Sequence, residues 1–384
     1  MTGIRRTKIH VAIAGMLISL CSYAQTRFDV IGNFHSAWPD SLTHQVIHSF
    51  DRLLISIENE QPDTTLIDTE EADLNRNFFR YLKSIEKKDT IPDYFRAQLI
   101  NFYPVGKHEC LLTLAYLKNN EIGCIQTFLA KENNGKIVFA SPLKYNTRHW
   151  KTKTIGTITY FFPDTIDIGR AELFDRKNIT IARKLNQPVR HWDMYMCPDY
   201  QTVLRLQGCL YESASNGSIN SGYIMDPKTF FSAMNDEDFS HDVLHKYASK
   251  IRGKMRNRSA ECGLAYYWGN AYYSGATGKA PDLNELLPVL QQYLRSHKDA
   301  RLLELFDKDP DVLAEYGYPK PIQVTRIISA VICREIERQK GTESIIELLK
   351  CGRGDENFFK SIDKLLGIRR DNFENEVRKF IFAP

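Results

Sequence analysis

Apolar residues change their spacing twice along this chain of 384 residues. Between residues 40 and 89 they recur at the helical interval, which predicts two amphipathic helices. Between residues 97 and 141 they alternate instead, and Asn119-Asn120 and Asn133-Asn134-Gly135 supply hairpin turns. Helices followed by a curled antiparallel sheet predict an N-terminal α+β domain.

The second half of the chain begins with a mixed section and continues with helices. Strands are predicted at residues 157–162, 192–196 and 223–225, and helices at 168–185 and 200–206. Further helices are predicted at residues 239–251, 259–268, 283–294, 301–306, 322–340, 344–350, 358–365 and 372–380, with Gly341 and Gly367 as stops. We expect an α+β protein with one domain over residues 25–150, a basic linker within 144–153, and a second domain over 155–384.

Residues 1–24 have the form of an export signal. A basic start, an apolar run and the small residues of a cleavage site follow one another: Arg5, Arg6 and Lys8, then Val11 to Leu20, then Ser22 and Ala24. The mature chain is expected to begin at Gln25 and to be periplasmic or secreted. Cys21 suggests a lipoprotein, but Leu20 stands where the lipid-attachment signal has a small residue, so we expect a free protein.

Two classes of partner find no support in the sequence. The formal charge of +4 is spread along the chain without a dense Lys/Arg tract, so no nucleic-acid partner is predicted. Beyond the signal no segment approaches about 18 consecutive apolar residues, so no transmembrane anchor is predicted.

Seven of the eight cysteines remain once Cys21 is removed with the signal. An odd number cannot all pair within one chain, and no C-x-x-C is present. Cys110 and Cys124 lie in one predicted hairpin, where the register places Cys124 opposite Ala115. No disulfide is therefore predicted between these two cysteines.

The segment between Phe239 and Trp268 contains residue types that bind metals, at a spacing that would let them share one ion. His241 and His245 are four residues apart, so on a helix both imidazoles lie on one face and can reach one Zn²⁺. Glu261 opens the next predicted helix, which Ser259 is expected to cap. A His/His/Glu set with an open fourth position is typical of catalytic zinc.

One residue departs from the zinc-peptidase pattern H-E-x-x-H. Asp242 follows the first histidine, where that pattern has Glu. The basic residues of the connector before Glu261 are interpreted as a solvated segment; they are Arg252, Lys254, Arg256 and Arg258.

From Thr157 to Phe380 the chain resembles the gluzincin, or peptidase-MA-like, zinc metallopeptidases, in the form common in exported proteins of Bacteroidetes-type bacteria. Three places carry the resemblance: HDVLH at 241–245, ECGLAY at 261–266, similar to the family's E-G-x-A-x-Y, and the helical region that ends in FFKSIDKLLGI at 358–368. The interval from His245 to Glu261 is somewhat short for the family, and Cys262 replaces a small residue. The resemblance implies a zincin-like second domain.

The resemblance also implies a reaction and roles for single residues. Zn²⁺ held by His241, His245 and Glu261 would polarise a peptide carbonyl and activate water, with Asp242 as general base. Tyr316 or Tyr318 would donate a hydrogen bond to the oxyanion. The substrate would be a peptide or protein.

Two alternatives use the same residues differently. Asp242 is one methylene shorter than Glu, so the chain is alternatively a non-catalytic pseudo-peptidase that binds peptide or a surface partner. The dipeptide His241-Asp242 also occurs in HD-type phosphohydrolases, but those are all-helical, whereas strands precede it here.

Overall fold

The computed structural model describes residues 28–31, 36–86, 96–118, 121–217, 222–224, 228–233, 236–271 and 279–383. The predicted signal, its cleavage site and the turn at Asn119-Asn120 lie outside these residues. The chain forms two compact units. The first comprises Met1–His149, Gln201–Ser218 and Met225–Pro227, and the second comprises Trp150–Tyr200, Ile219–Ile224 and Lys228–Pro384.

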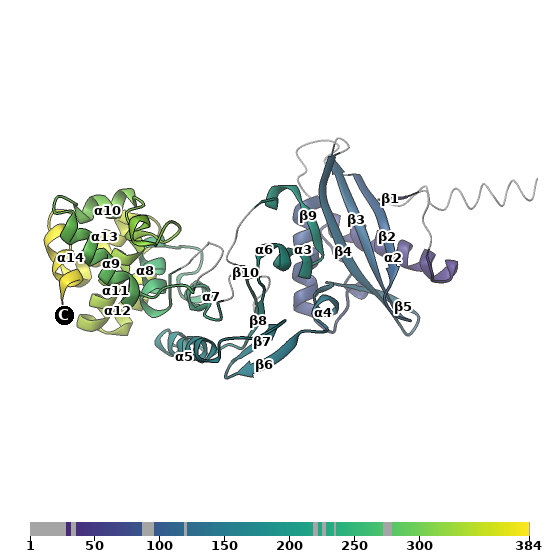
Figure 1. Cartoon of the computed structure of the whole chain (residues 1–384), viewed down its shortest axis with the longest axis horizontal. Coiled ribbons are helices and arrows are strands. Elements are labelled where there is room, and N and C mark those ends of the chain that lie inside the picture. Colours follow the sequence, from purple (N-terminus) through teal and green to yellow (C-terminus); the bar gives the residue numbers. More distant parts are fainter. Residues whose placement is uncertain are drawn as a thin grey trace, which may run out of the picture. The chain divides into compact units, whose positions relative to one another are not determined.

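The first unit is a sheet with two helices. Its strands are β1 (Phe28–Val30), β2 (Arg96–Pro104), β3 (Glu109–Lys118), β4 (Glu121–Asn133) and β5 (Lys136–Ala140), in that order, and β9 (Cys209–Glu212) also pairs with β4. The helices α2 (Asp40–Glu58) and α3 (Ala72–Glu86) bury their apolar faces against the sheet (Figure 1). Phe50 of α2 packs 4.9 Å from Phe128 and 5.0 Å from Phe139, between ring centroids.

The predicted hairpins are present in this sheet. Asn134 and Gly135 have φ angles of 52° and 79° and turn β4 into β5. A bulge near Tyr116 places Cys124 opposite Tyr116 rather than Ala115. All seven cysteines after the signal are free thiols, in agreement with the absence of a Cys110–Cys124 disulfide.

Two short elements lie where the sequence predicted a linker. They are α4 (Leu143–Asn146) and β6 (Lys151–Ile155). The helix α6 (Tyr200–Leu206) follows its prediction, but together with β9 it belongs almost entirely to the first unit.

The second unit contains a mixed sheet of five strands in the order β10-β11-β8-β7-β6. The strands β7 (Ile158–Phe162), β8 (Trp192–Met196) and β11 (Thr229–Ser232) are parallel, whereas the outer strands β6 and β10 (Gly222–Ile224) are antiparallel to their neighbours. The helix α5 (Ile168–Lys184) connects β7 to β8. Its buried Asn178 accepts hydrogen bonds from Trp192 Nε1 and the Tyr247 hydroxyl, both at 2.9 Å, and so ties the sheet to the helices.

The rest of the second unit is helical, as predicted. Its helices are α7 (Ser240–Arg252), α8 (Arg258–Trp268), α9 (Leu283–Ser296), α10 (Leu302–Lys308), α11 (Val324–Lys340), α12 (Thr342–Leu349), α13 (Asp355–Leu366) and α14 (Phe373–Phe382) (Figure 1). Gly341 and Gly367 end α11 and α13 with φ angles of 82° and 70°, which glycine adopts without strain. The chain is therefore an α+β protein with a sheet-rich N-terminal region and a mostly helical C-terminal part.

The helices α8 and α11 approach each other closely at Gly263. A Cβ atom on this residue would lie 2.5 Å from Ser329 Cβ and 2.8 Å from the Ser329 carbonyl carbon. Only glycine fits at this separation, so α8, which carries Glu261, is held directly against the central helix.

Within the described ranges, no helix is both long enough and apolar enough to cross a bilayer.

Candidate metal centre

An acidic tripeptide anchors the start of α7. The Asp236 carboxylate forms an ion pair with Arg170 Nε at 2.5 Å, and the Asp238 carboxylate forms one with Lys177 Nζ at 2.7 Å. Both carboxylates are fully buried. Asp238 also accepts the backbone N–H of Ser240 at 3.0 Å, at the first residue of the helix. Ion pairs to α5 therefore fix the segment that leads into His241.

The helix α8 is fixed at its own start by Asn257. The Asn257 side chain caps the helix by accepting Ala260 N–H at 3.0 Å, and its amide donates to the carbonyls of Gly352 and Gly354. Ser259, the predicted cap, instead donates to Asp355 at 2.7 Å. The buried Glu261 is held in the first turn of this helix.

The two histidines lie together as their spacing predicted. His245 Nε2 is 3.0 Å from His241 Nε2. His241 Nδ1 is 2.8 Å from the backbone carbonyl of Asn270, and the His241 backbone N–H donates to the Asn270 side chain at 3.2 Å. Donation from Nδ1 to a carbonyl leaves the lone pair on Nε2, which is how metal-binding histidines are commonly oriented.

Glu261 completes the cluster, and its carboxylate is surrounded by cations. Its side chain is 1 % exposed, with Oε1 2.7 Å from His245 Nδ1 and 3.0 Å from Arg256 Nε. Arg252 Nε contacts the other oxygen, Oε2. Among the described residues no donor meets Oε1 with hydrogen-bond geometry, so this buried oxygen is unsatisfied.

The two imidazoles differ in their affinity for protons. Burial, followed by the positive charge of His245, holds the pKa of His241 well below its usual range. Burial also lowers the pKa of His245, but the close contacts with Cys262 and Glu261 outweigh burial, and the pKa rises to about 9. A protonated His245 can thus bridge the neutral His241 and the Glu261 carboxylate.

The donors fit zinc in type, but in this conformation they do not surround one point. His245 faces His241 with Nε2 and Glu261 with Nδ1, so its two ring nitrogens are turned toward different partners. Over the described ranges, no group of three or more His, Cys, Asp and Glu side chains is arranged to hold a metal ion. The unsatisfied oxygen of Glu261 and the paired Nε2 atoms nevertheless provide the ligand types that zinc prefers.

Asp242 lies on α7 beside His241 and is partly buried. Burial raises the pKa of its carboxyl group, while the positive charges of His245, Lys246 and Arg256 act in the opposite direction. A carboxylate with a raised pKa is a better proton acceptor near neutral pH.

Among the described residues, a tyrosine other than the two predicted ones contacts His241. Tyr316 meets the ring of Tyr293, with 6.5 Å between centroids, and Tyr318 packs on the hydrophobic core. Tyr266 of α8 instead meets His241 edge-on, at 5.8 Å between ring centroids. Its position five residues after Glu261, within ECGLAY, is the sequence signal that identifies it.

Cys262 is predicted to be the most readily alkylated of the cysteines. Burial raises its pKa, but the hydrogen bond to His245 and nearby arginines lower it to about 7, and the side chain is partly exposed. Its reaction with iodoacetamide should accelerate as pH rises through about 7, because the thiolate is the nucleophile. Peptide mapping should find buried Cys110, Cys197 and Cys333 unmodified under the same conditions, and preferential labelling of any of these three would contradict the prediction.

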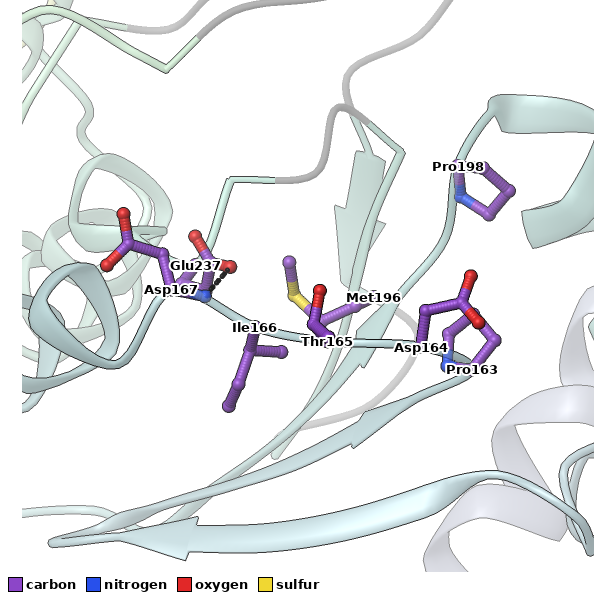
Figure 2. Close-up of a pocket in the computed structure, with 8 residues that line it drawn as sticks. All are labelled: Pro163, Asp164, Thr165, Ile166, Asp167, Met196, Pro198 and Glu237. Atoms are coloured by element: carbon purple, nitrogen blue, oxygen red, sulfur yellow. Dashed lines mark hydrogen bonds between the residues drawn. The ribbon is translucent and has the colours of Figure 1, made fainter.

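A separate cavity of about 340 Å³ lies at the sheet of the second unit. Figure 2 shows its lining residues: Pro163, Asp164, Thr165, Ile166, Asp167, Met196, Pro198 and Glu237. These residues follow or end β7, β8 and β11, so the cavity lies at the carboxyl ends of parallel strands, a common ligand position in sheets of this kind. Glu237 accepts the Asp167 N–H at 2.7 Å. Its carboxyl groups are those of Asp164, Asp167 and Glu237, and Asp167 already pairs with Lys279 at 2.6 Å.

The cluster on α7 and α8 is the better candidate for chemistry, because it combines ligand-type side chains, burial and perturbed pKa values. Comparison with protein-family models finds no match, and comparison with curated proteins finds none either. The functional assignment therefore rests on the residues of this cluster and their geometry.

Proposed function

We propose that the chain is an exported, zinc-dependent metallopeptidase-like protein of the gluzincin type, whose metal ligands are His241, His245 and Glu261. One observation carries this proposal. Two imidazole Nε2 atoms lie 3.0 Å apart on α7, and an unsatisfied carboxylate oxygen of Glu261 from the next helix lies within 2.7 Å of the second imidazole.

The surrounding residues prepare these side chains for a metal. The Asn270 carbonyl accepts the Nδ1 proton of His241, so the lone pair of that ring is on Nε2, and the ion pairs of Asp236 and Asp238 hold the start of α7. Bound zinc would supply a Lewis acid that polarises a carbonyl and acidifies water. Asp242 would accept the proton of that water and pass it to the leaving amine.

Tyr266 is a better candidate than Tyr316 or Tyr318 for the phenol that would donate a hydrogen bond to the oxyanion. Burial raises its pKa above the usual range, so its hydroxyl stays protonated and can donate. That hydroxyl accepts the Gln323 N–H at 3.4 Å, a contact that uses a lone pair of the oxygen and not the hydroxyl proton, which an oxyanion could accept.

The proposed substrate is an extended peptide. The strand β10 stands at one end of the sheet order in the second unit, two strands from β8. A peptide can extend such a sheet by adding a strand to its edge. The cavity at the strand ends in the same unit would accept a basic side chain of that peptide.

The variant Asp242→Glu tests the catalytic role directly. Glu restores one methylene of reach, and a shift on the order of 1 Å in a catalytic group changes rates by about a hundredfold. We expect zinc-dependent cleavage of quenched fluorescent peptides to rise by up to about that factor, and Asp242→Asn to abolish it. Cleavage that is equal in the native, Glu and Asn forms would remove Asp242 from the reaction.

The non-catalytic alternative is favoured by a different observation. Arg252 and Arg256 both contact the Glu261 carboxylate and so neutralise the ligand charge that zinc requires. If the native chain and Asp242→Glu both fail to cleave broad peptide libraries while binding peptides, the protein acts as a peptide-binding pseudo-peptidase.

A further inference from the structure

One guanidinium group contacts two of the proposed metal ligands and the cysteine next to them. Arg256 Nε lies 3.0 Å from Glu261 Oε1, and Arg256 Nη2 lies 3.2 Å from His245 Nε2 and 3.5 Å from Cys262 Sγ. Nitrogen, oxygen and sulfur ligands of this kind are the ones that bind zinc. The cationic head of Arg256 therefore lies where a metal cation would be attracted.

The guanidinium fits this position poorly. Arg256 Nε and Glu261 Oε1 are both buried and 3.0 Å apart, yet neither has a hydrogen-bond partner among the described residues. A buried ion pair offsets its desolvation only when its geometry also satisfies hydrogen bonds. The pair therefore leaves part of the carboxylate's bonding capacity for another cation.

The position of Arg256 in the chain also allows it to leave. It lies between the end of α7, where Gly253 has a φ of 58°, and Asn257, the cap of α8. Its side chain is 37 % exposed, whereas that of Glu261 is 1 % exposed. The arginine can turn into solvent while the carboxylate cannot.

We propose that Arg256 is a built-in competitor of the metal: its guanidinium occupies the cation position beside two of the proposed ligands, Glu261 and His245, and withdraws when zinc binds. This inference rests on the proposed function, because it assigns regulation to the same ligands. Zinc binding therefore carries the added cost of displacing an internal cation from the Glu261 carboxylate.

The variant Arg256→Gln tests this competition through metal affinity. Isothermal titration of the refolded mature chain with zinc should show a dissociation constant at least tenfold lower in Arg256→Gln than in the native chain. Lys254→Gln is the matched control, since it removes the same charge from the same connector at an exposed position, and it should bind zinc as the native chain does. Circular dichroism confirms that each variant is folded.

The outcomes separate this inference from the proposed function. Equal zinc affinity in the native chain and Arg256→Gln overturns the competition but leaves the metal centre standing. If neither chain binds zinc, and Glu261→Gln gives the same null result, the metal centre itself fails and the inference fails with it.

A crystal structure of the native chain at saturating zinc provides a second test that does not depend on a variant folding. A guanidinium withdrawn from Glu261 supports the proposal, and one that still contacts Glu261 beside bound zinc overturns it.

Discussion

Glu261→Gln should both destabilise the second unit, by about 3 kcal/mol, and eliminate zinc binding. The Glu261 carboxylate is 1 % exposed and contacts His245, Arg252 and Arg256. Removing one partner of a buried ion pair typically costs about 3–5 kcal/mol because the other charges remain buried without compensation. We place the loss at the lower end of that range because Arg256, which is 37 % exposed, can turn into water.

Urea denaturation with excess chelator measures the stability change, and zinc titration measures the loss of metal. Glu304→Gln is the matched control, since Glu304 also meets two cations, Arg301 and Lys308, but is 51 % exposed. Its variant should lose less than about 1 kcal/mol. Equal losses of unfolding free energy in the two variants would mean that the buried Glu261 cluster stabilises the fold no more than a surface ion pair does.

Asp236→Asn is expected to lower the free energy of unfolding by more, about 3–5 kcal/mol. Every acceptor position of the Asp236 carboxylate is used: Arg170 donates to both oxygens at 2.5 and 2.7 Å, and the backbone N–H groups of Asp238 and Ala280 donate at 3.0 and 2.6 Å. The amide nitrogen of Asn would present hydrogens to two of these donors. The variant therefore loses the charge and gains a repulsive contact.

Asp307→Asn provides the comparison for this loss. Asp307 also pairs with an arginine, Arg370, but both side chains are 40 % exposed, so its loss should stay below about 1 kcal/mol. Urea denaturation of both variants measures the difference. The role of Asp236 as the anchor of α7 would be refuted if its variant retained native stability.

Elements with a strong apolar period were predictable, and those that depend on distant pairing were not. The strand β8 and the helix α6 have the bounds expected from their patterns, and Gly341 and Gly367 end helices as expected. The strand β6 was not predicted because its KTKTI sequence is almost wholly exposed and has no apolar face. The strand β9 pairs with β4 across more than 80 residues, and no local pattern announces that pairing.

The part of the candidate centre that depends on helical spacing was predictable. The interval of four residues brings His241 and His245 together, and Glu261 lies at the start of the next helix as expected. The interpretation of Arg252 and Arg256 as a solvated connector was wrong. The chain turns after α7 at Gly253, with a φ of 58°, and Arg252 before this turn and Arg256 after it both contact Glu261, an arrangement that charge and composition alone do not reveal.

The close approach at Gly263 limits how this centre can be re-engineered. With only 2.5 Å between a hypothetical Cβ and Ser329, the backbone of α8 has no room to slide toward α11. Ligand distances for a larger or smaller ion would have to be adjusted through rotamers on α7 or through the length of the 253–257 connector. In a redesign, α8 would keep its position, and changes would be made in α7, which carries the histidines, and in the connector that follows it.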